Sequence, residues 1–107
     1  MATFAPRPHA FNKSSPTNGS GGHSPASLAL SWNASSGATS YKYCVDTIKN
    51  NSCDTSWVPV GTNLSTTLVL LKGSTTYYWQ VRAVNSAGST DANAGTWWSF
   101  KTTNSTK

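Results

Sequence analysis

Side chains that commonly carry out catalysis are scarce in this sequence of 107 residues. The carboxylates are Asp46, Asp54 and Asp91, and the histidines are His9 and His23. Both histidines lie in Pro- or Gly-rich segments, which are poor supports for a general base because they do not fix its position. The many serines include none in a Gly-x-Ser-x-Gly sequence, which exposes a nucleophilic serine between a strand and a helix. We therefore predict that the protein is not an enzyme.

Metal-ligating side chains are equally few. Two cysteines without clustered histidines fall short of the four ligands that a structural zinc ion requires. Asp46 and Asp54 alone do not supply the density of oxygen ligands that a calcium ion requires. The sequence also contains no phosphate-binding loop. We therefore expect neither a metal ion nor a cofactor.

The two cysteines, Cys44 and Cys53, lie close together in a chain that is otherwise rich in Ser, Thr and Asn. This usage is typical of an exported protein with one disulfide bond, and it predicts an extracellular or cell-surface location. Alternation places Cys44 on the outward face of its strand, and a hairpin closing over residues 47–50 would set Cys53 opposite it. The alternative is a pair of free thiols in a reducing compartment.

The formal net charge of +5 arises mainly from the shortage of acidic residues. No two of the lysines and arginines are adjacent, whereas nucleic-acid binding requires a concentrated basic patch, so we do not expect it. No apolar run reaches the ~18 residues that a membrane helix needs, so we expect no membrane insertion. The start, MATFAPRPHAF, lacks the basic and apolar segments of a signal peptide, and we expect a module taken from a longer protein.

Aromatic residues are the best candidates for a binding site. If Trp98 and Phe100 point into a core, alternation turns Trp97 outward, although the opposite orientation of this strand fits the pattern too. The candidate ligand surface that follows from the outward orientation consists of Trp97, Tyr78, Arg82, Lys42 and Trp57. Because sugars stack on such aromatic surfaces, these residues could bind a carbohydrate. The alternative is that they only pack against one another across the strands of a solvent-facing sheet.

The elements that would position these residues are all strands. β-branched and aromatic residues are many, and good helix formers are few. Alternation of large and polar side chains predicts seven strands, which are a short one around Phe11 and the segments 27–32, 40–47, 56–62, 65–71, 76–84 and 96–102. Pro59 cannot donate a ladder hydrogen bond, so 56–62 is predicted to be an edge strand. Residues 85–95 are predicted to form a loop.

Four motifs follow one another in a recognisable order. Trp32 ends the strand LALSW, a Tyr-x-Tyr pair follows in the next strand, and LKGSTTY is similar to a Leu-x-Pro-x-Thr-x-Tyr corner. The segment YYWQVRAVNSAG then contains a Tyr-x-x-x-Val-x-Ala-x-Asn pattern. Together, over about residues 11–102, these motifs resemble the fibronectin type III domain. The closing WWSFKT is similar to the last strand of its bacterial extracellular members.

The resemblance implies an all-β, seven-stranded antiparallel immunoglobulin-like sandwich over residues 10–102, with a linker or tail at 1–9 and a tail at 103–107. In it, Tyr77 is a tyrosine corner, whose ring enters the core and whose hydroxyl bonds to backbone near the preceding turn. The core residues are expected to be Trp32, Tyr41, Leu71, Tyr77, Trp79 and Val81. The corner proline is replaced by Gly73, and most members lack the cysteine pair.

The function expected from these features is that of a non-catalytic extracellular module. It would act as a spacer or protein-interaction unit within a larger secreted or cell-surface protein, and its partners would be the neighbouring domains of that chain. As an isolated domain it would be a monomer. The alternative is a carbohydrate-binding module that uses the outer-face aromatics and is attached to a polysaccharide-active enzyme, so another protein or a polysaccharide is a possible partner.

Overall fold

The computed structural model describes residues 7–49 and 52–104. Within these ranges the chain forms nine strands and one short 3₁₀ helix. In chain order they are β1 (Lys13–Ser15), β2 (Ser20–His23), β3 (Ser27–Trp32), β4 (Ser40–Asp46), β5 (Val58–Gly61), β6 (Ser65–Val69), β7 (Thr76–Asn85), β8 (Gly88–Asp91), η1 (Ala92–Gly95) and β9 (Trp98–Thr102).

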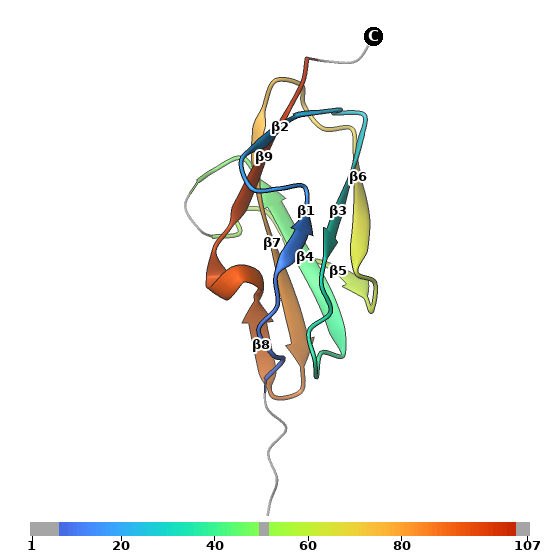
Figure 1. Cartoon of the computed structure of the whole chain (residues 1–107), viewed down its shortest axis with the longest axis vertical. Coiled ribbons are helices and arrows are strands. Elements are labelled where there is room, and N and C mark those ends of the chain that lie inside the picture. The colour runs from blue at the N-terminus through green and yellow to red at the C-terminus, as the bar shows by residue number, and fades with distance from the viewer. Residues whose placement is uncertain (1–6, 50–51, 105–107) are drawn as a thin grey trace, which may run out of the picture.

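The strands form two sheets that pack face to face (Figure 1). The smaller sheet has the order β1-β3-β6, and the larger has the order β2-β9-β7-β4-β5, with β8 paired to β7. The pairings are antiparallel except that β2 runs parallel to β9. The all-β sandwich is therefore confirmed, and β5, which contains Pro59, is an edge strand as predicted.

The core lies between the two sheets and follows the alternation of the longest strands. Because successive side chains of a strand point to opposite faces, β7 can direct every second residue inward. The buried hydrophobic residues include Phe11, Leu30, Trp32, Tyr41, Leu68, Tyr77, Trp79, Val81, Ala83 and Phe100. Leu71, also expected in the core, is partly buried and packs against this cluster.

Tyr77 joins the core to the turn that precedes β7. Its ring stacks on Phe100, with ring centroids 5.5 Å apart, while its hydroxyl oxygen accepts a hydrogen bond of 2.8 Å from the backbone N–H of Lys72. This is the contact that the resemblance implies for a tyrosine corner. A second tyrosine acts in the same way, because the hydroxyl of Tyr41 accepts a 2.8 Å hydrogen bond from the backbone N–H of Ser35.

Removing the corner hydroxyl with Tyr77→Phe is expected to lower the free energy of unfolding by ~0.5–1.5 kcal/mol, the net value of one hydrogen bond. Urea unfolding followed by circular dichroism measures this change. Tyr78→Phe is the matched control, because Tyr78 lies on the outer face of the same strand and is half-buried. Equal losses in both variants would contradict the role assigned to the Tyr77 hydroxyl.

Two strands were missed by the sequence analysis. β8 lies in the segment predicted to be a loop, and β2 lies among the glycines after the first turn. Both are short and polar, and they are held by backbone pairing to β7 and β9, so they carry no alternating apolar pattern. The first strand also begins later than predicted, at Lys13 rather than around Phe11.

The predicted tails fall partly outside the described residues, at 1–6 and 105–107. Their described parts are attached to the sandwich. Pro8 is buried, and its carbonyl oxygen accepts a hydrogen bond from the hydroxyl of Thr90. At the other end, the backbone N–H of Thr103 donates a 2.8 Å hydrogen bond to the carbonyl of His23. No helix in the described part of the chain is long and apolar enough to cross a membrane.

Candidate functional site

The outer face of the larger sheet is covered in part by the loop between β4 and β5. The disulfide bond between Cys44 and Cys53 attaches this loop to β4. Cys44 is fully buried, as is its register partner Gln80 on β7. Cys44 thus lies on the outward face of β4, as alternation predicts, and it is buried there because the loop covers that side of the strand.

The hairpin predicted over residues 47–50 is not the one that forms. β4 pairs instead with β5, through Tyr43 and Val58, so Cys53 lies in the connecting loop rather than on a paired strand. Asn50 lies outside the described residues. Sequence alternation could not reveal this arrangement, since it locates strands but not the strand with which each one pairs.

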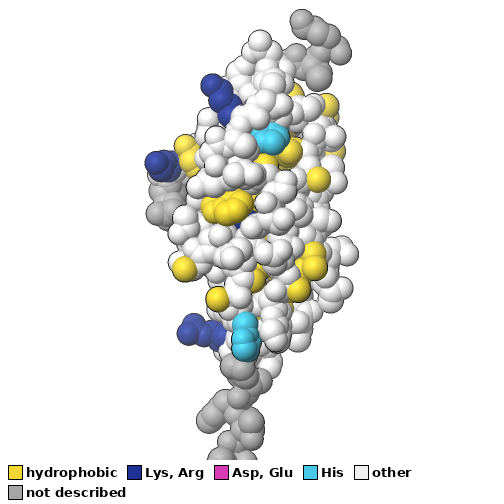
Figure 2. Space-filling model, viewed as in Figure 1, with side chains coloured by type: hydrophobic (Ala, Val, Ile, Leu, Met, Phe, Trp, Pro, Cys, Tyr) yellow, Lys and Arg dark blue, Asp and Glu magenta, His cyan; other side chains and the backbone are white. Residues whose placement is uncertain are grey.

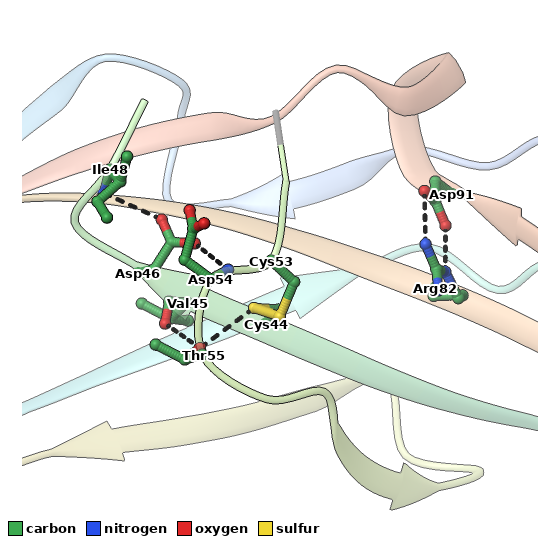
Figure 3. The surroundings of a disulfide bond; sticks show 9 residues. All are labelled: Cys44, Val45, Asp46, Ile48, Cys53, Asp54, Thr55, Arg82 and Asp91. Carbon is green, nitrogen blue, oxygen red and sulfur yellow. Dashed lines mark hydrogen bonds and ion pairs between the residues drawn. A yellow bond between two sulfur atoms is a disulfide. The ribbon is translucent and has the colours of Figure 1, made fainter. Parts of the chain in front are cut away.

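Polar side chains hold both ends of the described loop (Figure 3). The carboxylate of Asp46 accepts hydrogen bonds from the backbone N–H groups of Ile48, at 3.1 Å, and Asp54, at 2.9 Å. The hydroxyl of Thr55 donates to the carbonyl of Val45 at 3.1 Å. Asp46 is thus used as a loop anchor, and the described residues contain no group of three or more potential metal ligands.

On the same face, four side chains form a continuous contact series, which we call the Trp–Arg stack (Trp97, Trp57, Arg82 and Asp91), and Trp57 comes from the loop. The ring centroids of Trp97 and Trp57 are 6.2 Å apart, with an interplanar angle of 55°. The guanidinium carbon of Arg82 lies 4.1 Å from the ring centroid of Trp57. The same guanidinium donates to both carboxylate oxygens of Asp91, through Nε at 2.6 Å and Nη2 at 3.2 Å.

The structure therefore brings three members of the candidate ligand surface together, with Trp57 in contact with both Trp97 and Arg82. Lys42 is the register partner of Arg82, and Tyr78 is the register partner of Asp46, so both lie on the same face. Within residues 7–49 and 52–104, neither Lys42 nor Tyr78 makes an aromatic or ionic contact with the stack.

Asp91 is a member of the stack that the sequence did not predict. It lies opposite Arg82 because β8 pairs with β7, and this pairing was not predicted.

A shallow, open depression of about 670 Å³ adjoins the Trp–Arg stack. Its lining includes Arg7, Arg82, Ser89, Thr90, Asp91 and Gly95. Two arginines and one aspartate give it a positive balance, in keeping with the surface as a whole. On the face shown in Figure 2, lysine and arginine side chains lie along one edge, and no described acidic side chain is visible.

Lys13 is a second functional candidate, and it was missed because lysine is almost always exposed. It is only 3% exposed. Its ammonium nitrogen lies 5.7 Å from the ring centroid of Trp79 and 5.4 Å from that of Trp98. It donates to the side-chain oxygen of Asn93 at 3.0 Å and to the carbonyl of Thr96 at 2.7 Å. Lys13 thereby attaches β1 to the turn that precedes β9.

Burial lowers the pKa of Lys13 from 10.5 to about 7, although the nearby carboxylate of Asp91 acts in the opposite direction. The unfolded chain therefore binds more protons than the folded one between pH 7 and 10.5, so stability increases with pH across this window. We expect the free energy of unfolding to increase by about 2 kcal/mol between pH 7 and pH 9. Urea unfolding at closely spaced pH values measures this dependence.

The matched variant for this prediction is Lys13→Met, which keeps an unbranched side chain of similar length without the amine. Its stability is expected to change much less over the same pH range, because the variant lacks the buried amine whose pKa is lowered. Parallel pH profiles for the wild type and the variant would contradict the assignment to Lys13.

Comparisons with known proteins point to one fold. No family model and no curated protein sequence matches the chain. Among solved structures, the fibronectin type III domain of human fibronectin type III domain containing protein 3 is 21% identical, with a TM-score of 0.63, and the match covers 97% of this chain and 94% of that one. The chicken CNTN1 FN1-FN3 domains are 20% identical, with a TM-score of 0.59, and the match covers 98% of this chain and 38% of that one. The chain has the fibronectin type III fold.

Proposed function

We propose that this chain is a non-catalytic module of a larger secreted or cell-surface protein, where it acts as a spacer or protein-interaction unit. The observation that carries the proposal is the placement of its ends. Arg7 lies against Gly88, at the turn between β7 and β8, whereas Thr103 is bonded beside β2. These two regions lie at opposite ends of the sandwich (Figure 1). A domain inserted through such ends separates its neighbours by its own length.

Two further observations support the proposal. The similar chicken structure contains several domains of this fold, and this chain spans only 38% of it, so the fold occurs there as a repeated module. The bonded Cys44–Cys53 pair suits an oxidising environment, which favours an extracellular location. As an isolated domain, the protein is expected to be a monomer. Within the longer chain, its partners would be the adjoining domains.

The spacer role is tested by measuring the distance between the two ends. Nitroxide labels at Ala10→Cys and Thr103→Cys, both exposed positions, report this distance by pulsed electron resonance while the native disulfide remains intact. We expect one narrow population at long distance, because both segments are bonded to the sandwich. A short or very broad distribution would show that the ends are not held apart.

A second candidate function is carbohydrate binding by the outer face, in a module attached to a polysaccharide-active enzyme. It is favoured by the contact of Trp57 with Trp97, since both indoles are half-buried and thus partly accessible. Titration with a panel of soluble glycans, followed through the indole N–H signals, tests it. The buried Trp32 and Trp79 serve as internal controls. Saturable shifts confined to Trp57 and Trp97 support binding, and silence across the panel leaves the spacer role alone.

A further inference from the structure

We infer that the outer face binds an acidic oligosaccharide, through the Trp57–Trp97 pair and the adjoining depression that contains Arg7 and Arg82. This inference rests on the second candidate function, because it names the ligand class of that surface. It does not depend on the spacer role. Three features of the described residues carry it, namely an accessible aromatic pair, a fixed arginine–carboxylate pair and an excess of positive charge.

The aromatic pair supplies the stacking part of the site. The two indoles are 6.2 Å apart at their centroids and are inclined by 55°, so they form a bent surface rather than a flat one. The disulfide at Cys53 and the hydrogen bond from Thr55 to the carbonyl of Val45 fix the loop that carries Trp57. Little freedom of this loop is therefore left to lose when a ligand binds, which favours affinity.

Arg82 and Asp91 supply the polar part. A guanidinium group has five N–H donors, and Asp91 accepts from two of its nitrogens, so donors remain for oxygen atoms of a ligand. The side chains are 30% and 29% exposed, which leaves both groups in reach of the surface. Contact with Trp57 and Asp91 holds the guanidinium plane in place before a ligand arrives. Sugar hydroxyl groups and carboxylates are both recognised by such paired donors and acceptors.

The positive charge of the site favours acidic sugars over neutral ones. Arg7 lines the depression beside Arg82, and Lys42 is the register partner of Arg82 on the neighbouring strand. Asp91 is the acidic residue that lines the depression, and it is paired with Arg82. Three cations and one carboxylate leave a net positive site. A sugar chain that carries carboxylates, as a uronic acid polymer does, matches this charge and the aromatic surface together.

Tetragalacturonate and its fully methyl-esterified form provide a matched pair of probes, since esterification replaces each charged carboxylate with a neutral methyl ester and leaves the sugar chain unchanged. Each probe is titrated into the isolated protein, and binding is followed through the indole and backbone N–H signals. We expect the acid to bind more tightly than the ester. Arg7→Gln is expected to weaken binding of the acid by up to about fivefold, the effect of one exposed charge pair, and to leave binding of the ester unchanged. Lys72→Gln, which removes a charge on an exposed residue outside the depression, should change neither.

Trp97→Ala should weaken binding of both probes at least tenfold, because stacking does not depend on charge. The backbone N–H spectrum of Trp97→Ala shows whether this variant is folded. Trp97→Phe, which keeps an aromatic face, should restore part of the affinity.

Two results would overturn the acidic ligand class but leave carbohydrate binding standing. One is equal binding of the acid and the ester, and the other is equal effects of Arg7→Gln and Lys72→Gln. Absence of binding by both probes, together with silence across the panel of soluble glycans, would overturn this inference and the second candidate function alike.

Discussion

Replacing Trp79 with alanine is expected to lower the free energy of unfolding by about 3–5 kcal/mol, because it opens a large cavity in the core. Trp79 has no exposed surface, and its ring packs edge to face against Trp98, with the centroids 6.2 Å apart. The same ring lies beneath the ammonium group of Lys13. Domains of this size have ~5–15 kcal/mol of stability in total, so the variant should lose a large part of its stability.

Urea unfolding followed by far-ultraviolet circular dichroism measures the loss. Trp97→Ala is the matched control, because the same residue type is removed from a half-buried position on the outer face. Its loss is expected to be less than half that of Trp79→Ala. A loss below about 1 kcal/mol for Trp79→Ala would contradict the placement of this side chain at the centre of the sandwich.

Removing the disulfide with the double variant Cys44→Ala, Cys53→Ala is expected to lower the free energy of unfolding by roughly 2–3 kcal/mol. The crosslink closes a short loop, and this is the value that the restricted freedom of the unfolded chain predicts for it. Cys44 is fully buried, so lost packing adds to the effect. Replacing both cysteines together avoids leaving a reactive thiol on the surface.

The same variant has a structural readout, since the disulfide fixes the loop that carries Trp57. The contact between Trp57 and Arg82 should weaken, with a change in indole fluorescence and in the Arg82 side-chain signals. Reduction of the wild-type protein should reproduce both effects. Thr55→Val, which leaves the disulfide in place and removes the hydroxyl's contacts with the carbonyl of Val45 and the sulfur of Cys44, is expected to have a much smaller effect. Stability within 0.5 kcal/mol of the wild type in the double variant would contradict the anchoring role.

The inner face of the sandwich could be predicted well, because its residues repeat at the period of a strand. In β7 the inward residues Tyr77, Trp79 and Val81 alternate with polar or half-buried ones, and this pattern depends only on neighbours in the sequence. The same holds for β3, where Leu30 and Trp32 are buried. Pro59 likewise marked an edge strand by its chemistry alone.

The outer face was harder to predict, because its burial depends on segments that are distant in the sequence. Gln80 alternates as an outward residue, yet it is fully buried and donates a 3.1 Å hydrogen bond to the carbonyl of Ala92. Lys13 is buried by contacts with Asn93 and Trp98, about eighty positions further along the chain. No local pattern records such pairings, which also explains why β8 and its Asp91 were missed.

The account of the outer face depends on one arrangement, in which the loop after β4 folds onto the larger sheet so that Trp57 covers the Arg82 guanidinium. The most direct measurement is the nuclear Overhauser contact between the Trp57 ring protons and the Arg82 side chain in the oxidised protein. With a centroid distance of 4.1 Å, we predict strong contacts and a clear upfield shift of the Arg82 signals from the indole ring current. Missing contacts and unshifted Arg82 signals would mean that the loop lies elsewhere, and the ligand site built on it would have to be abandoned.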